Sequence, residues 1–450
     1  MTSDAFPEPS AEPGVGPYGV ETTGNYLVLM AEDAVDEGVG VLESKAGIRV
    51  APLEAGADEG VTAEQLAQED HVLFPKLGVA LVKPEPDQVG ALAVTSHEES
   101  SVLAVEPERV VYAIESVGLQ TEVPTVTEVG SISTEYLRGY RDGVDGLIRA
   151  IGSPASGEAA VAAAFDESQA TWGLQLTRAD ASRFSGRGVR VAVLDTGLDL
   201  QHPDFAGRSI RSQSFVLGEA VQDGHGHGTH CIGTSCGPLQ PTRLPRYGVA
   251  YEAEILAGKV LNNRGRGADG GILAGITWAI ANRCRIISMS LGSAVPRGAS
   301  PSVVFETVAR RATGFGTVIV AAAGNDSKRA TGITEPVSHP ANCPSIMAVA
   351  AVDSRLGIAS FSNAGLNPNG GQVDVAGPGV RVYSSWPRPT TYNTISGTSM
   401  ATPHVAGIAA LHCQANPTIS PNGLKSLLAQ TARRLALSSI DVGAGLVQAP

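Results

Sequence analysis

The chain has 450 residues, which is more than one ordinary hydrophobic core accommodates, so we expect at least two domains. Its formal net charge is −13 and the sequence has no basic stripe, which excludes nucleic acid and anionic membrane surfaces as partners. The five cysteines are an odd number without a repeated C-x-x-C pair, which argues against a disulfide framework and against that class of zinc site.

The N-terminal segment 1–22 is acidic and rich in proline and glycine, so it lacks the apolar content to offset ordering entropy, and we predict disorder there. It also lacks the basic start and apolar core of a secretory leader, and no apolar run reaches membrane-spanning length. From this pattern we predict a cytoplasmic protein, or one exported by a non-classical route, without a membrane partner.

Residues 23–115 alternate strand and helix patterns. Strands are predicted at 25–30, 48–51, 77–82 and 110–114, and helices at 35–47 and 86–94. The order β-α-β-β-α-β is typical of a small α+β domain of the split βαβ kind. The connector 116–167 contains one amphipathic helix, since apolar residues recur at helical spacing from Leu137 to Ile151.

The remaining residues, 168–450, read as short apolar strands separated by helices. The strands are "VRVAVLD", "EILAGKVL", "RIISMSLG" and "TVIVAAAGN", and "GILAGITWAIAN" and "SVVFETVARRA" are helical patterns. Continuous apolar strands that alternate with helices indicate an α/β domain with a mostly parallel central sheet covered on both faces.

Four polar side chains are candidates for functional residues. Asp195 follows a strand, His227 lies among glycines in "DGHGHGTHCIGT", Asn325 ends "AAAGN", and Ser399 enters a helix in "GTSMATPHVAG". Each has a structural alternative as a turn former or helix cap. A metal site at His225, His227 and His230 is the alternative for the histidines, although their spacing is not that of two ligands one helical turn apart.

Taken together, "VAVLDTGLDLQHPDF", "HGTHCIGT", "SMSLGS", "AAAGN" and "GTSMATPHVAG" resemble the subtilisin-like serine proteases, in that family's order and over roughly 168–449. The resemblance implies a three-layer fold and a serine endopeptidase that acts on polypeptides. It implies Ser399 as nucleophile, His227 as general base and Asp195 as its orienting acid, with Asn325 stabilising the oxyanion. Two alternatives stay open: a catalytically silent peptide-binding relative, and an esterase, for which the motif order is wrong.

Further roles follow from the resemblance alone. Edge segments Ser290-Leu291-Gly292 and Gly265-Arg266-Gly267, with Gly265 and Gly267 as the matching glycines, are implied to pair with an extended substrate. No cofactor is implied for catalysis. Asp204 matches a ligand of the family's usual strong calcium site, but the loop that should supply the other ligands lacks the expected asparagine. Structural calcium is implied at a second, weaker site, formed by Asp374 with the backbone oxygens of Pro344 and Ile346. Cys231 is interpreted as a small buried residue beneath His227, with a redox switch as the alternative.

The N-terminal domain is similar to an inhibitory prosegment of that family, because "VLAVEPERVV" resembles a prosegment's last strand. We therefore predict that this domain inhibits its own active site, that cleavage falls between about 115 and 170, and that the chain is a monomer. About fifty residues separate it from the protease-like part, whereas such prosegments usually end directly at the mature chain.

Overall fold

The computed structural model describes residues 14–15, 20–50, 61–98, 100–114 and 165–450. The predicted helix between Leu137 and Ile151, with nearly all of the connector, lies outside these residues. Disorder was expected for 1–22, but β1 (Gly14–Val15) pairs with β2 (Glu21–Met30). The rest of that segment, 1–13 and 16–19, also lies outside the described residues.

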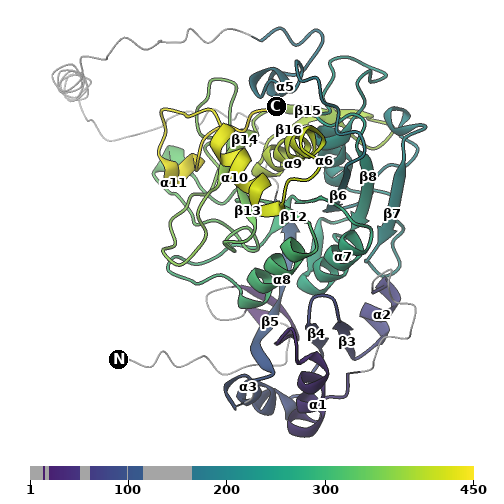
Figure 1. Cartoon of the computed structure of the whole chain (residues 1–450), viewed down its shortest axis with the longest axis vertical. Helices are drawn as coiled ribbons and strands as arrows, with labels where there is room; N and C mark the ends of the chain where they lie inside the picture. Colours follow the sequence, from purple (N-terminus) through teal and green to yellow (C-terminus); the bar gives the residue numbers. More distant parts are fainter. Residues whose placement is uncertain (1–13, 16–19, 51–60, 99, 115–164) are drawn as a thin grey trace, which may run out of the picture. The chain divides into compact units, whose positions relative to one another are not determined.

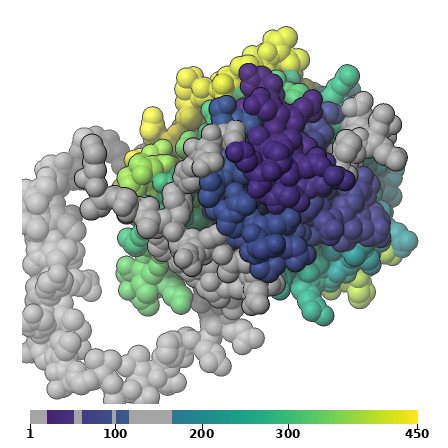
Figure 2. Space-filling view, turned by 90° about the horizontal axis from the view of Figure 1, so that it is seen from below, coloured from purple at the N-terminus to yellow at the C-terminus, as the bar shows by residue number. Residues whose placement is uncertain are grey.

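The N-terminal elements form an antiparallel sheet with helices packed on it. After β2 follow α1 (Val35–Ala46), α2 (Ala63–Gln68), β3 (His71–Phe74), β4 (Val79–Val82), α3 (Gln88–Glu98) and β5 (Val102–Ala113). The sheet order is β5-β2-β4-β3, and α1 lies beside α3 (Figure 1). In Figure 2 these purple and blue residues form one patch on the face shown.

One predicted strand of this part is wrong. Residues 48–50 form no strand, and the second strand of the β-α-β-β-α-β order is β3. Ile48 and Val50 are nevertheless buried in the core with Val28, Leu42 and Leu92. Their alternation of apolar and polar residues therefore results from burial beside the sheet and not from pairing with a strand of the sheet.

The sheet of the C-terminal part has the order β14-β13-β12-β10-β6-β8-β7, and every neighbouring pair is parallel. Its strands are β6 (Arg190–Asp195), β7 (Ile210–Ser214), β8 (Glu254–Lys259), β10 (Ile286–Met289), β12 (Val318–Ala322), β13 (Met347–Val352) and β14 (Val375–Pro378). Most residues of these strands, apart from those of the edge strand β7, are buried. The predicted mostly parallel sheet is confirmed.

Helices cover this sheet on both faces, which confirms the predicted three-layer fold (Figure 1). α6 (His227–Cys236) packs against α9 (Thr398–Ala415), and both contact β6. α7 (Asp269–Ala281), α8 (Val303–Gly314) and α10 (Pro421–Thr431) contact β8, β6 or β12. α5 (Trp172–Leu176), α11 (Ser439–Val442), the 3₁₀ turns Pro203–Phe205 and Arg329–Thr331 and the hairpin of β15 (Val382–Ser385) and β16 (Tyr392–Ile395) complete this part.

Two short strands join the two parts of the chain. β9 (Arg266–Ala268) and β11 (Leu291–Gly292) both pair antiparallel with β5, so the last N-terminal strand lies between two segments of the C-terminal part. Among the described residues, no helix combines the length and apolarity needed to cross a membrane.

Candidate active site

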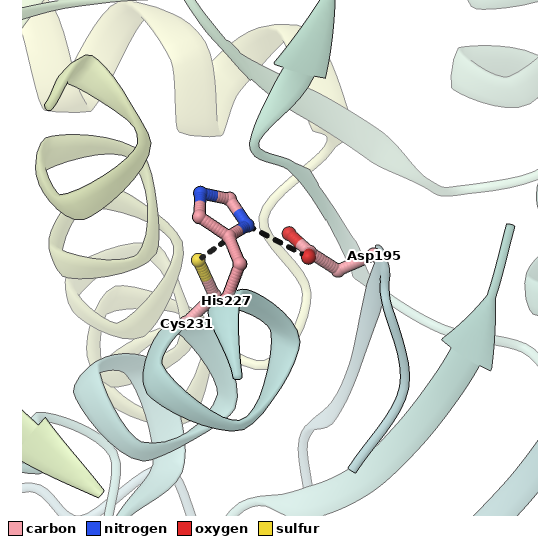
Figure 3. A group of neighbouring side chains, drawn as sticks. All are labelled: Asp195, His227 and Cys231. Atoms are coloured by element: carbon pink, nitrogen blue, oxygen red, sulfur yellow. Dashed lines mark hydrogen bonds and ion pairs between the residues drawn. The ribbon is translucent and has the colours of Figure 1, made fainter. Parts of the chain in front are cut away.

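Asp195 and His227 come together at the carboxyl edge of the parallel sheet. β6 ends at Asp195 and α6 begins at His227, after a glycine, Gly226, that needs a positive φ of 111°. The His227 Nδ1 atom lies 2.8 Å from Asp195 Oδ1, and both side chains are buried (Figure 3). The Thr196 N–H donates to the same carboxylate oxygen at 2.7 Å, which fixes the carboxyl group.

Cys231 lies one helical turn after His227, as predicted for a residue on the same face of α6 (Figure 3). Its Sγ is 3.9 Å from His227 Nδ1 and 3.5 Å from the Ser399 carbonyl oxygen. Asp195, His227 and Cys231 are the one group in the described part of the chain with metal-ligand spacing. Burial raises the pKa of the Cys231 thiol.

The other two histidines of the motif do not join them in a metal site. His230 is buried in α6, and its Nε2 lies 2.9 Å from the Val382 carbonyl oxygen. Burial lowers the pKa of His230 to about 3, so it is neutral and structural. The His225 ring lies edge-on to His227 with ring centroids 6.3 Å apart.

Asp223 holds the loop before α6, and the sequence analysis did not single it out. Its buried carboxylate accepts the N–H groups of His225 (2.9 Å), Gly226 (2.8 Å) and Thr229 (2.9 Å). It also accepts the hydroxyls of Thr229 (2.7 Å) and Thr196 (3.0 Å). Because Thr196 follows Asp195, this carboxylate ties the His227 loop to the Asp195 loop. An acidic residue at the start of a Gly-His-Gly-His stretch was the available signal.

Ser399 and Asn325 meet at one carbonyl oxygen of the N-terminal part. Ser399 Oγ donates to the Ile114 carbonyl oxygen at 2.6 Å, and Asn325 Nδ2 donates to the same oxygen at 3.0 Å. The Asn325 amide is held in this orientation because its Oδ1 accepts the N–H and the hydroxyl of Thr398, each at 2.9 Å. A Cβ atom on Gly397 would come within 2.9 Å of Asn325 Nδ2, so the approach requires glycine.

The predicted edge segments lie on either side of β5, which ends one residue before Ile114. Val111 pairs with Gly267, and Tyr112 pairs with Gly292 and Arg266. Ala113 pairs with Leu291 and donates its N–H to the Gly265 carbonyl oxygen at 2.8 Å. The Ile114 N–H donates to the Ser290 carbonyl oxygen at 3.2 Å. All five residues expected to bind an extended peptide therefore contact this strand.

The two acidic residues implied in calcium binding differ in their surroundings. The Asp204 carboxylate already accepts the Thr242 N–H (2.6 Å) and the hydroxyls of Tyr247 (2.6 Å) and Tyr392 (3.0 Å), so protein donors occupy it. Asp374 instead accepts the Ala348 N–H at 2.7 Å, and burial raises its pKa to about 6.

A family model for the subtilase family matches residues 186–445. The chain belongs to this family. It is 39% identical to subtilisin DY of Bacillus licheniformis over 280 residues, which cover 61% of this chain and 96% of that protein. It is 41% identical to subtilisin BL of Lederbergia lenta over 283 residues (62% and 96%) and to subtilisin E of Bacillus subtilis strain 168 over 266 residues (59% and 65%).

As a subtilase, the chain is a serine-type endopeptidase that acts on polypeptides, and this hydrolysis needs no cofactor. The predicted cytoplasmic location is wrong, because the subtilisins that it matches are secreted extracellular proteases. The composition of residues 1–22, on which the prediction rested, does not determine where a protease of this family acts.

The five hydrogen bonds to Asp223 predict that Asp223→Asn lowers both stability and activity. The amide group would face the Thr229 N–H with a donor, and an unpaired buried donor costs about 1–3 kcal/mol. We expect a lower melting temperature, which is measured in a protein that also carries Ser399→Ala, so that self-digestion cannot occur. We also expect a lower kcat/KM when Asp223→Asn is the only substitution.

Asp353→Asn is the matched control, because Asp353 also accepts backbone N–H groups, from Arg355 and Gly357, but in the turn that follows β13. It should leave kcat/KM at the wild-type value. Equal kcat/KM in both variants would contradict the proposed role of Asp223.

Proposed function

We propose that Ser399, His227 and Asp195 form the catalytic triad of this serine endopeptidase, with Asn325 as an oxyanion donor. The observation that carries the proposal is the convergence of Ser399 Oγ and Asn325 Nδ2 on one peptide carbonyl oxygen. An oxyanion hole must present its donors at the oxygen that becomes negative in the tetrahedral intermediate. The fixed Asn325 amide meets this requirement, and the Ser399 N–H at the start of α9 is the second donor in our proposal.

In this mechanism the neutral His227 takes the Ser399 proton as the hydroxyl attacks the carbonyl carbon. Collapse of the tetrahedral intermediate expels the amine, which receives that proton, and leaves an acyl-enzyme on Ser399. A water molecule, deprotonated by the same imidazole, then hydrolyses the ester. Asp195 fixes the imidazole with Nδ1–H toward its carboxylate, which leaves Nε2 to exchange protons.

The pH dependence of activity follows from His227. Burial lowers its pKa, but the Asp195 carboxylate raises it, and the net pKa lies well above the usual value of 6.5. Since only the neutral imidazole accepts a proton, kcat/KM should rise with pH through a midpoint above about 6.5. Asp195→Asn should shift the midpoint to lower pH and reduce kcat by about 10⁴.

His227→Ala and Asn325→Leu should each reduce kcat on an unfolded polypeptide by about 10² or more. A wild-type rate in either variant would contradict the mechanism. Reaction of Ser399 with a fluorophosphonate without peptide-bond hydrolysis would favour the esterase alternative, and absence of both reactions would favour the silent relative.

We further propose that residues 21–114 are an inhibitory prosegment and that the chain cuts itself after Ile114. The position of β5 between β9 and β11 supports this, since an inhibitor that occupies the substrate strand blocks the cleft. The Ile114 carbonyl then belongs to the peptide bond that is cut. This site lies at the N-terminal end of the range 115–170 in which the sequence predicted cleavage. Inhibitor and protease share one chain, so we propose a monomer.

Charged contacts hold the two parts together and support this proposal. The Glu106 carboxylate accepts the Val303 N–H at 2.6 Å and the Ser302 hydroxyl at the start of α8. Glu108 accepts the Gly270 N–H at 2.9 Å in the first turn of α7. Both carboxylates therefore cap helix N-termini, where negative charge is favoured. From the other side, the Arg311 guanidinium donates to the Leu77 carbonyl oxygen and to that of Met30 at 2.8 Å.

Self-cleavage predicts a defined product. The purified wild-type chain should yield a new N-terminus at Glu115, read by N-terminal sequencing and intact mass, whereas Ser399→Ala should stay at full length. Ser396→Ala is the matched control, since that hydroxyl accepts the Arg381 N–H at 2.8 Å and should not affect processing. A wild-type protein that is fully active while uncut would rule out inhibition by this part.

We also propose a structural calcium ion held by Asp374 with the carbonyl oxygens of Pro344 and Ile346. The residues fit a cation because the Asp374 charge is incompletely compensated, as its raised pKa of about 6 indicates. The Lys425 ammonium, which donates to the Ser345 carbonyl oxygen at 3.1 Å, lowers that pKa in part. A neighbouring cation repels the ion, so we expect a weak site of millimolar affinity.

Calcium should therefore stabilise the protein in a pH-dependent way. Because the folded-state pKa of Asp374 lies above the unfolded value of about 3.9, stability falls as the pH rises from about 3.9 to about 6 and stays reduced above that. A bound cation offsets this loss. In the Ser399→Ala chain, 5 mM calcium, an amount of roughly the expected affinity, should raise the melting temperature more at neutral pH than well below the pKa of Asp374. Asp374→Asn should abolish this difference; an unchanged calcium response in that variant would contradict the site.

A further inference from the structure

The backbone pairing between β5 and β9 ends at Ala268. Beyond it, a side chain accepts the next hydrogen bond from β5. Val110 pairs with Ala268, and α7 begins at the next residue, Asp269. The Arg109 N–H of β5 donates to Asp269 Oδ2 at 3.0 Å, in place of a backbone carbonyl. Counted back from the Ile114 carbonyl at Ser399, Arg109 is the sixth residue before the cut.

The same carboxylate holds a buried histidine that the proposed mechanism does not use. His339 Nε2 lies 3.1 Å from Asp269 Oδ1, and both side chains are buried, with exposures of 0% and 2%. The His339 Nδ1 atom lies 2.6 Å from the Arg109 guanidinium. Arginine only donates hydrogen bonds, so Nδ1 accepts, Nε2 carries the proton and His339 is neutral.

Arg109, His339 and Asp269 therefore form a chain of two hydrogen bonds that runs from a cation of the substrate strand to a carboxylate. The pair of His339 and Asp269 lies entirely in the protease part, so β5 supplies neither residue. We propose that Asp269 and His339 form a subsite that selects a basic side chain, arginine above all, at the sixth substrate residue before the cut. This inference rests on the proposed cleavage after Ile114, because that position sets the register.

Ionisation of His339 should control this selectivity. The groups that face it are the Arg109 guanidinium, the carboxylates of Asp269 and Glu106, and the edge of the Phe305 ring, 4.6 Å between centroids. Burial and then Arg109 lower the pKa of His339, and Asp269 opposes them. By linkage, protonation of His339 disfavours a bound arginine, since Nδ1 then donates and the charges repel.

The test compares two acetylated, quenched-fluorescence peptides on the processed wild-type enzyme. One has the sequence of residues 108–117 and the other has alanine in place of Arg109. Because a charge-assisted hydrogen bond to a partly exposed side chain is involved, kcat/KM should be about tenfold higher for the arginine peptide. The ratio of the two values is the readout, so a general loss of activity in a variant cancels.

Two variants and one titration complete the experiment. His339→Phe keeps an aromatic ring but removes the acceptor, and Asp269→Asn removes the charge; each should bring the ratio close to one. In the wild type the ratio should fall as the pH is lowered, whereas protonation of His227 slows both peptides equally. A ratio near one in the wild type, a ratio unaffected by both variants, or a pH-independent ratio would overturn the subsite. Failure to cleave either peptide after isoleucine would instead contradict the proposed cleavage site.

Discussion

The carbonyl oxygen of Ile114 receives the Ser399 hydroxyl and the Asn325 amide together, and the remaining contacts of the cleft depend on that placement. It sets the register of β5 against β9 and β11, and hence which residue, five positions before Ile114, meets Asp269. The same hydrogen bonds engage Ser399 Oγ, so this hydroxyl is occupied while β5 is in place. In the proposed mechanism, substrate binding and inhibition would therefore use one set of donors.

Buried carboxylates organise this half of the molecule through backbone N–H groups and hydroxyls. Asp195, Asp223 and Asp269 are each almost inaccessible, and each accepts at least two hydrogen bonds. Ionised acceptors of this kind fix geometry strongly, because an unpaired buried charge is very unfavourable. Asp204 is also buried, and its carboxylate accepts two tyrosine hydroxyls.

The sequence allowed the proposed catalytic residues to be predicted, but not most of the residues that contact them or the bound strand. Asp195, His227, Asn325 and Ser399 lie in contiguous motifs, so their identities and their sheet edge could be inferred. Asp269 and His339 could not be paired, because 70 residues separate them and only the fold brings both to β5. The segment 48–50 was mistaken for a strand because burial alone produces the same apolar alternation. The strand β3 was missed because its four residues follow directly on a polar stretch and were assigned to it.

β5 is twelve residues long and belongs to two sheets at once, since it pairs with β2 along the N-terminal part and with β9 and β11 at its end. Under the proposed inhibition, closure of the cleft is thus coupled to the folding of the N-terminal sheet, so any change that unfolds this sheet also releases β5. An active molecule that cleaves the N-terminal part of an uncut one would then activate it. On this proposal, activation of a population is autocatalytic, with a delay that shortens as the protein concentration rises.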